Sequence, residues 1–225
     1  MKNFLKGKKI LISAGSTWVA IDRVRVITNI FSGRTGLEIA KYASKKGAIV
    51  TLLMGYGSVS LDKKLKEKIK VIGFKYFDEL YDLVEKEVGS KKYDVLIHSA
   101  AVSDYRPKKI GDGKIKSGRK NLTIKLKPTV KIADKVKTFD PSIFLVKFKL
   151  EVETSDKELI EIAYKSMLDS RADLIVANNL STVKGDGKTY IIDPDKNAVK
   201  VNERKKLAED LLKNIFNKNN IDKNK

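Results

Sequence analysis

Short apolar runs alternate with amphipathic helical segments in the first half of the chain. Residues 9–13 and 48–54 are short, largely apolar runs, as is typical of strands buried on both faces of a sheet. A helical pattern over residues 35–46 separates them and ends at Gly47, which suits the left-handed conformation after a helix. The alternation continues with a strand at 70–74, a helix at 77–88 and a strand at 93–98. This order predicts an α/β fold, a Rossmann-like, doubly wound, mostly parallel sheet.

The second half of the chain interrupts this alternation and then resumes it. Residues 104–131 are rich in glycine and lysine, include a short alternating strand at 122–126, and predict an arm or flap over the sheet edge. The further expected elements are a helix at 130–138, strands at 144–148 and 172–177 around a helix at 156–170, a closing C-terminal hairpin at 189–192 and 198–201, and a last helix at 203–216. We expect a single domain over residues 1–216, with its arm at about 104–131, followed by a polar, frayed tail at 217–225.

The composition of the 225 residues narrows the class of protein. No cysteine is present, which excludes a thiolate metal site, a disulfide framework and a cysteine nucleophile. The formal net charge is +19, but the lysines are spread along the chain without a nucleic-acid-binding motif, so we do not expect a nucleic-acid partner. The first residues lack the apolar core of a signal peptide, and no apolar run approaches the ~20 residues of a membrane span. We therefore expect a cytoplasmic protein with no membrane partner.

Residues 21–36 have the layout of a phosphate-binding loop. Gly15 forms a turn after the first strand, and Ser32-Gly33-x-x-Gly36 opens the next helix. Free backbone N–H groups at the start of a helix, together with the helix dipole, favour an anion there. Arg25 adds positive charge to this stretch, and an asparagine such as Asn29 can hold a carbonyl or a carboxylate.

Polar clusters follow four of the predicted parallel strands. They occupy residues 15–17, 99–104, 148–151 and 177–179. Because ligands of open α/β sheets bind beyond the carboxyl ends of the strands, we expect these clusters to form one site. Asp104 closes one cluster, where its carboxylate can accept hydrogen bonds from a sugar hydroxyl. His98, the single histidine, ends an apolar strand, and we interpret it as structural rather than catalytic.

Other nucleotide-binding enzymes fit these motifs less well. A dinucleotide enzyme needs Gly-x-Gly-x-x-Gly against the first strand and an acid after the second, but the second strand ends at Gly55 without one. Tyr105 and Lys109 have the spacing of the catalytic pair in short-chain oxidoreductases, although Pro107 disfavours the helix that this pair requires. No P-loop motif is present. The alternatives that stay open are an NAD(P)-dependent short-chain-type oxidoreductase and a basic nucleotide- or nucleic-acid-binding module.

Together these motifs resemble the phosphopantothenate–cysteine ligase (phosphopantothenoylcysteine synthetase) family, in its stand-alone, streptococcal-like form. The resemblance covers nearly the whole chain, and its strongest residues are 21–29, 32–36, 100–105 and 114–116. Residues 97–99 and 148–150 are similar to the short streptococcal-type enzymes. It implies a ligase that joins phosphopantothenate to L-cysteine through an acyl-nucleotide, at the expense of CTP or ATP, in coenzyme A biosynthesis. It further implies a homodimer, Mg²⁺ accompanying the triphosphate co-substrate, and neither flavin nor NAD.

The resemblance also implies roles for individual residues. Asn29 contacts the substrate carboxylate and then the acyl carbonyl, Arg25 binds the substrate phosphate across a dimer interface, and Lys114 reaches the triphosphate. The junction of pantothenate and nucleotide is lined by Ala100, Ala101 and Asp104. The turn and helix start that face phosphate are Gly15, Ser32, Gly33 and Gly36. The base and ribose are bordered by Pro128, Thr129, Val130 and Phe148.

This chain departs from the family pattern in several places. Ser16 stands for the second glycine of the first turn, and Ile30-Phe31 stand for a small polar pair after Asn29. The sequence 127–130 replaces an Asn-Pro-Asp-Ile-type element beside the nucleotide base. Two helix lysines of the fused bacterial enzymes have no counterpart, because Ser166 and Ser170 occupy those spacings.

Overall fold

The computed structural model describes residues 3–118, 120–180 and 188–216. Its centre is an eight-stranded sheet in the order β12-β11-β10-β9-β6-β1-β4-β5. The parallel strands are β1 (Lys9–Ala14), β4 (Ile49–Gly55), β5 (Lys70–Phe74), β6 (Val95–His98), β9 (Phe144–Val152) and β10 (Leu174–Leu180). At one edge, β11 (Thr189–Ile192) and β12 (Ala198–Val201) run antiparallel. The predicted Rossmann-like, mostly parallel sheet is confirmed, and the C-terminal hairpin has the predicted bounds.

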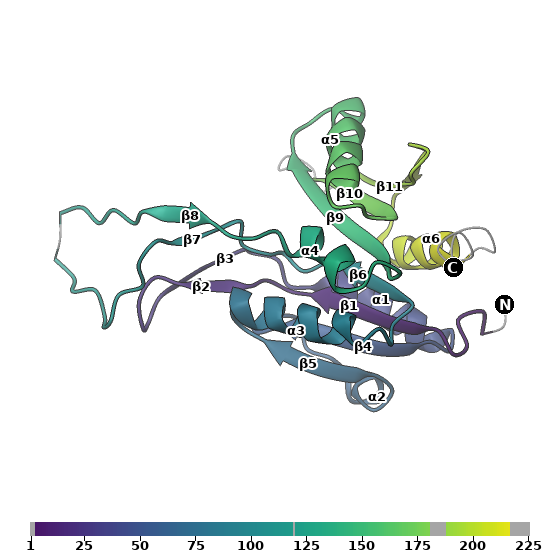
Figure 1. Cartoon of the computed structure of the whole chain (residues 1–225), viewed down its shortest axis with the longest axis horizontal. Coiled ribbons are helices and arrows are strands. Elements are labelled where there is room, and N and C mark those ends of the chain that lie inside the picture. Colours follow the sequence, from purple (N-terminus) through teal and green to yellow (C-terminus); the bar gives the residue numbers. More distant parts are fainter. Residues whose placement is uncertain (1–2, 119, 181–187, 217–225) are drawn as a thin grey trace.

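Helices cover both faces of the sheet (Figure 1). One face is packed by α1 (Arg34–Lys45) and α6 (Arg204–Phe216). The other face is packed by α3 (Phe77–Gly89), α4 (Ile132–Phe139) and α5 (Asp156–Asp169), while the short α2 (Lys63–Lys66) lies between β4 and β5 in the chain. Successive strand side chains enter opposite layers, so Ile12 packs toward α1 and Leu11 toward α3. Burial on both faces explains the largely apolar runs in the sequence.

Two narrow ribbons project from the carboxyl end of the sheet (Figure 1). One is the hairpin of β2 (Trp18–Ala20) and β3 (Val26–Thr28), and the other pairs β7 (Tyr105–Pro107) with β8 (Leu126–Pro128). We call residues 105–128 the arm. The expected arm is present, but it projects away from the sheet instead of lying over its edge (Figure 1). The stretch between the first turn and α1 was expected to be a polar loop, and that expectation was wrong, because β2 and β3 pair there.

The predicted strand at 122–126 is also wrong, because the pairing starts only at Leu126. The alternating side chains of this segment have no apolar layer to enter, and Leu122 remains exposed. In contrast, β9 and β10 run further than predicted because they pair with each other from Leu174 to Leu180. The expected tail at 217–225 lies outside the described residues. Among the described residues, no helix is both long and apolar enough to cross a membrane.

Candidate functional site

Glycine packing joins β1 to the start of α1. Gly33 has a φ of 74°, and a Cβ added to it would lie 2.7 Å from the backbone nitrogen of Gly15. A Cβ on Gly36 would lie 2.6 Å from the Ala14 Cβ. Only glycine allows backbones to approach this closely, and a left-handed φ adds a second demand for glycine at position 33. We call Gly15, Gly33 and Gly36 the glycine cradle.

The backbone N–H groups at the start of α1 carry a partial positive charge beside the cradle. Within the part of the chain described, no side chain caps this helix, and its first turn contains no acid. By comparison, the Ser155 hydroxyl accepts a hydrogen bond from Glu158 N at the start of α5, at 3.2 Å. Backbone N–H groups and the helix dipole at α1 therefore favour an anion. Ser32 precedes this turn and is half-buried, so the residues expected to face phosphate do lie together.

Asn29 links the base of the β2–β3 hairpin to the chain after β6. Its side-chain Nδ2 donates to the carbonyl oxygens of Ala101, at 3.1 Å, and Val102, at 3.3 Å. Ala101 is also tied to β1, because its N–H donates to the Gly15 carbonyl at 2.9 Å. The asparagine expected to contact the reacting carboxylate thus stands beside the glycine cradle and beside Ala101.

The bulky pair after Asn29 is exposed to solvent. Ile30 is 90% exposed and Phe31 is exposed as well. The loop is instead held by its backbone, since the Ser16 hydroxyl donates to the Phe31 carbonyl at 2.8 Å. The hydroxyl of Ser16, which stands where the family has a glycine, thus fixes the backbone of this loop.

His98 forms part of a buried polar layer under the site. Its Nδ1 lies 2.8 Å from the Ser13 hydroxyl, and that hydroxyl also accepts the Ala100 N–H at 3.3 Å. Burial lowers the pKa of His98 to about 4, and the positive charge of Lys147 lowers it further in the same direction. The imidazole is neutral at pH 7, and its hydrogen bond supports the turn after β6, in agreement with a structural role.

The expected nucleotide residues follow the β6 turn. Asp104 is exposed, and its carbonyl accepts the Thr129 N–H at 2.9 Å. The Thr129 hydroxyl donates to the Ser103 carbonyl at 2.6 Å, and Pro128 pairs with Tyr105 in the ribbon. Val130 is exposed next in the chain. These contacts bring Asp104, Pro128, Thr129 and Val130 to the base of the arm.

The β9 side of the expected pocket is less open. Phe148 is half-buried in the layer under α1 and α6. Ser170 is buried, and Lys147 Nζ donates to its hydroxyl at 3.3 Å and to the Ser166 carbonyl at 3.0 Å. Where the fused enzymes have helix lysines, this chain therefore has serines bonded to a strand lysine.

Arg25 and Lys114 lie apart from this group. Pairing of Trp18 with Thr28 and of Ala20 with Val26 puts Arg25 at the tip of the hairpin and Asn29 at its base. Four residues of extended chain span roughly 13 Å. Lys114 is exposed on the arm, in the segment beside the same hairpin tip. Arg25 and Lys114 thus form a second group, at a distance from the glycine cradle.

Some residues that shape the site were missed in the sequence. A Cβ on Gly55 would lie 2.9 Å from the Ser16 carbonyl oxygen, so this glycine lets β4 pass close to the first turn. The Thr17 hydroxyl accepts the Ser103 N–H at 2.9 Å and ties the two turns together. The signal for Gly55 was a glycine at a strand end, which marks a close backbone approach. The Thr17 contact spans 86 residues and has no local signal.

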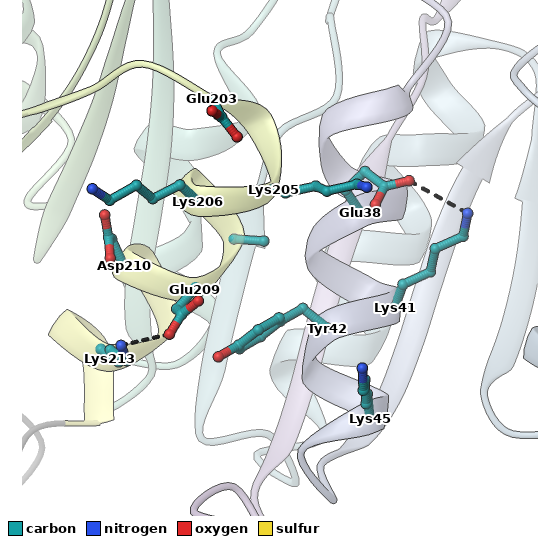
Figure 2. Close-up of a pocket in the computed structure, with 11 residues that line it drawn as sticks. Glu38, Lys41, Tyr42, Lys45, Glu203, Lys205, Lys206, Glu209, Asp210 and Lys213 are labelled. Carbon is teal, nitrogen blue, oxygen red and sulfur yellow. Dashed lines mark hydrogen bonds and ion pairs between the residues drawn. The ribbon is translucent and has the colours of Figure 1, made fainter. Parts of the chain in front are cut away.

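A hollow lies elsewhere, between α1 and α6 (Figure 2). It encloses about 670 Å³, and ion pairs of Lys41 with Glu38 and of Lys213 with Glu209 line it. Its mixed charges do not single out an anionic ligand, and the cluster of predicted residues is at the strand ends instead. Over residues 3–118, 120–180 and 188–216, no group of three or more metal-binding side chains occurs.

Comparison with known proteins identifies the family. The model described as the DNA/pantothenate metabolism flavoprotein C-terminal domain matches residues 5–218. The chain belongs to this family. The resemblance to phosphopantothenate–cysteine ligases, drawn from residues 21–36, 100–105 and 114–116, is therefore confirmed.

Relatives of this family show both similarity and a difference in length. The coenzyme A biosynthesis bifunctional protein CoaBC of Thermococcus kodakarensis is 43% identical over 176 residues, which cover 78% of this chain and 42% of that protein. The chain spans about half the length of the curated relatives it matches.

Solved structures from the family share the fold. The DNA/pantothenate metabolism flavoprotein from Streptococcus pneumoniae has a TM-score of 0.84 and 30% identity, covering 93% of this chain and 98% of that one. The C-terminal domain of a CoaBC protein has a TM-score of 0.78 and 28% identity, covering 96% of this chain and 97% of that one.

Tyr105 lies in strand β7 and not on a helix, so the short-chain oxidoreductase alternative was wrong.

Proposed function

We propose that this domain is a phosphopantothenate–cysteine ligase of coenzyme A biosynthesis. The observation that carries the proposal is the position of Asn29, whose amide stands beside Ala101 and the glycine cradle at the start of α1. A site that combines an amide donor with an anion-binding helix start suits a carboxylate reacting with a triphosphate. Family membership over residues 5–218 supports the same reaction.

The first half-reaction activates the substrate carboxylate. A carboxylate oxygen of phosphopantothenate attacks the α-phosphorus of CTP or ATP, the bond to the β-phosphate breaks, and pyrophosphate leaves. The N–H groups at the start of α1 bind phosphate oxygens, and Asn29 orients the carboxylate toward phosphorus. Asp104, Pro128, Thr129, Val130 and Phe148 border the nucleotide. Magnesium accompanies the triphosphate, held mainly by phosphate oxygens and water.

The second half-reaction forms the amide. The cysteine amine attacks the acyl carbon, the carbon–oxygen bond to the nucleotide breaks, and the nucleoside monophosphate leaves as the amine loses a proton. Negative charge develops on the acyl oxygen, where Asn29 Nδ2 becomes a donor by exchanging one of its two carbonyl partners. Ala100 and Ala101 leave room at the junction of the two substrates.

The substrate phosphate has its own binding residue in this proposal. Arg25 lies at the hairpin tip, roughly 13 Å along the strand from Asn29 of its own chain, so it extends beyond its own glycine cradle toward a substrate held by Asn29 of a second copy. The projecting arm and hairpin support a homodimer in which Arg25 binds across the interface. We retain the single domain over residues 1–216, with its arm, as the unit that acts.

A pyrophosphate-release assay tests the function. Purified protein receives phosphopantothenate, cysteine, Mg²⁺, and either CTP or ATP, and mass spectrometry identifies the product. We expect release of pyrophosphate with phosphopantothenate alone, and an amide product only when cysteine is added. Failure to form the amide with both nucleotides would refute the ligase assignment.

A further inference from the structure

A buried carboxylate joins the β2–β3 hairpin to the arm. Asp22, which is 3% exposed, lies in the hairpin turn. Its Oδ1 accepts the N–H groups of Val24 and Arg25, both at 2.8 Å, and its Oδ2 accepts the N–H of Ile115 at 3.0 Å. The first two bonds are local to the turn. The third reaches across 93 residues of chain to the middle of the arm.

The same arm residue is also held by Arg25. Arg25 Nη2 donates to the Ile115 carbonyl oxygen at 2.7 Å, and Arg25 Nε lies 3.8 Å from Asp22 Oδ2. Both backbone polar groups of Ile115 are thus bonded to the hairpin turn. A further bond runs from Gly111 N to the Ile21 carbonyl, at 3.0 Å. We call these contacts among Asp22, Arg25 and Ile115 the arm clamp.

The arm clamp does more than close a turn. A carboxylate that only caps a turn needs the two local N–H groups, which Oδ1 alone satisfies. The second oxygen, Oδ2, instead accepts the N–H of Ile115, whose neighbours in the chain are Lys114 and Lys116. Fixing Ile115 limits where both lysines can reach, because adjacent Cα atoms are about 3.8 Å apart.

We propose that Asp22 is a positioning residue that holds the Arg25 guanidinium and the Lys114–Lys116 segment together as one unit. The inference rests on the proposed function, in which Arg25 binds the substrate phosphate and Lys114 the triphosphate. A carboxylate that fixes both cations before substrate arrives removes part of the ordering cost of binding. Its three accepted N–H bonds and the guanidinium keep the pKa of Asp22 below its ordinary value, led by the bond from Ile115.

The variant Asp22→Asn tests this inference. The amide keeps the shape and one oxygen for the turn, but it presents N–H groups to the Ile115 N–H. Amide hydrogen exchange in the peptide 111–118, measured by mass spectrometry, should be faster in this variant than in the wild type. The KM values for phosphopantothenate and for the nucleotide should both rise about tenfold, as for loss of one charge-assisted hydrogen bond, while kcat changes less. Asp112→Asn, an exposed acid on the same arm, is the matched control and should match the wild type.

A second variant removes the same bond from the arm side. Ile115→Pro removes the backbone N–H that donates to Asp22 and leaves Asp22 itself in place. This variant tests the same bond if Asp22→Asn does not fold. Both variants remove the bond from Ile115 N–H to Asp22 Oδ2, so the double variant should lose less than the sum of the two single losses.

The possible outcomes separate the clamp from the reaction. Unchanged exchange in Asp22→Asn would overturn the clamp, and faster exchange with unchanged KM values would overturn its role in binding. Absence of ligase activity in the wild-type protein would overturn the proposed function, and with it the binding half of this inference. The exchange comparison does not depend on that activity.

Discussion

At the scale of single residues, Asn29 is the side chain on which the proposed chemistry depends most. Replacing it with alanine removes the donor to the acyl oxygen, so amide formation should fall about a hundredfold or more, as for loss of one oxyanion donor. The product assay with cysteine measures this. Ile30→Ala changes the next residue, which is 90% exposed, and should keep near-wild-type turnover. Wild-type-like turnover in Asn29→Ala would contradict the assigned role.

His98 permits a direct test of the buried layer under the site. Because it is the single histidine, one imidazole signal is expected in a proton NMR titration, with a pKa of about 4. The unfolded imidazole, with an ordinary pKa near 6.5, takes up a proton before the folded one does. The free energy of unfolding should therefore fall as the pH drops from 6.5 toward 4. At pH 5 the loss should be about 2 kcal/mol greater than in His98→Gln, which has no imidazole to titrate. A titration near pH 6.5 would show that the ring is not buried as described.

At the scale of elements, the glycine cradle fixes how α1 starts. In Gly33→Ala the new side chain would sit on a residue with a φ of 74°, and its Cβ would lie 2.7 Å from a backbone nitrogen. The free energy of unfolding should therefore fall by more than ~2 kcal/mol. Gly57→Ala is the matched control, because Gly57 has a φ of 76° but no atom within 4 Å of an added Cβ. It should lose about 1 kcal/mol. Urea denaturation measures the free energy of unfolding of both variants. Equal losses in the two variants would refute a steric clash at the cradle.

The elements differ in how far the sequence determines them. Strands such as β1 and β4 were predictable, because burial on both faces leaves a largely apolar run. The β2–β3 hairpin was not predictable, since three residues per strand leave too short a pattern to distinguish from a loop. The cradle was visible in its glycines, whereas Asp22 resembled any polar loop residue. Its bond to Ile115 depends on how two distant segments meet, and no local pattern encodes that meeting.

At the scale of the whole molecule, the arm and the β2–β3 hairpin carry apolar side chains that are exposed in the described part of the chain. Val24 and Ile110 are more than half exposed, and Tyr105 joins them near the base of the ribbon. Large exposed apolar side chains on projecting elements are typical of protein–protein contacts. These side chains lie on the two ribbons that project from the sheet in Figure 1, where a second copy of the chain would also meet Arg25. The exposed apolar groups thus support the proposed homodimer.

Ile110→Glu tests the dimer and its link to activity. A charged group at this 61% exposed position should be costly to bury, so light scattering after gel filtration should show a shift from the mass of two chains toward that of one. The KM for phosphopantothenate should rise at the same time, because Arg25 would no longer meet its substrate. Leu168→Glu places the same change at a 55% exposed position on α5, away from the arm, and should leave both mass and KM unaltered. A wild-type protein that runs as a single chain with full ligase activity would refute binding across an interface, and Arg25 would then have to act within its own chain.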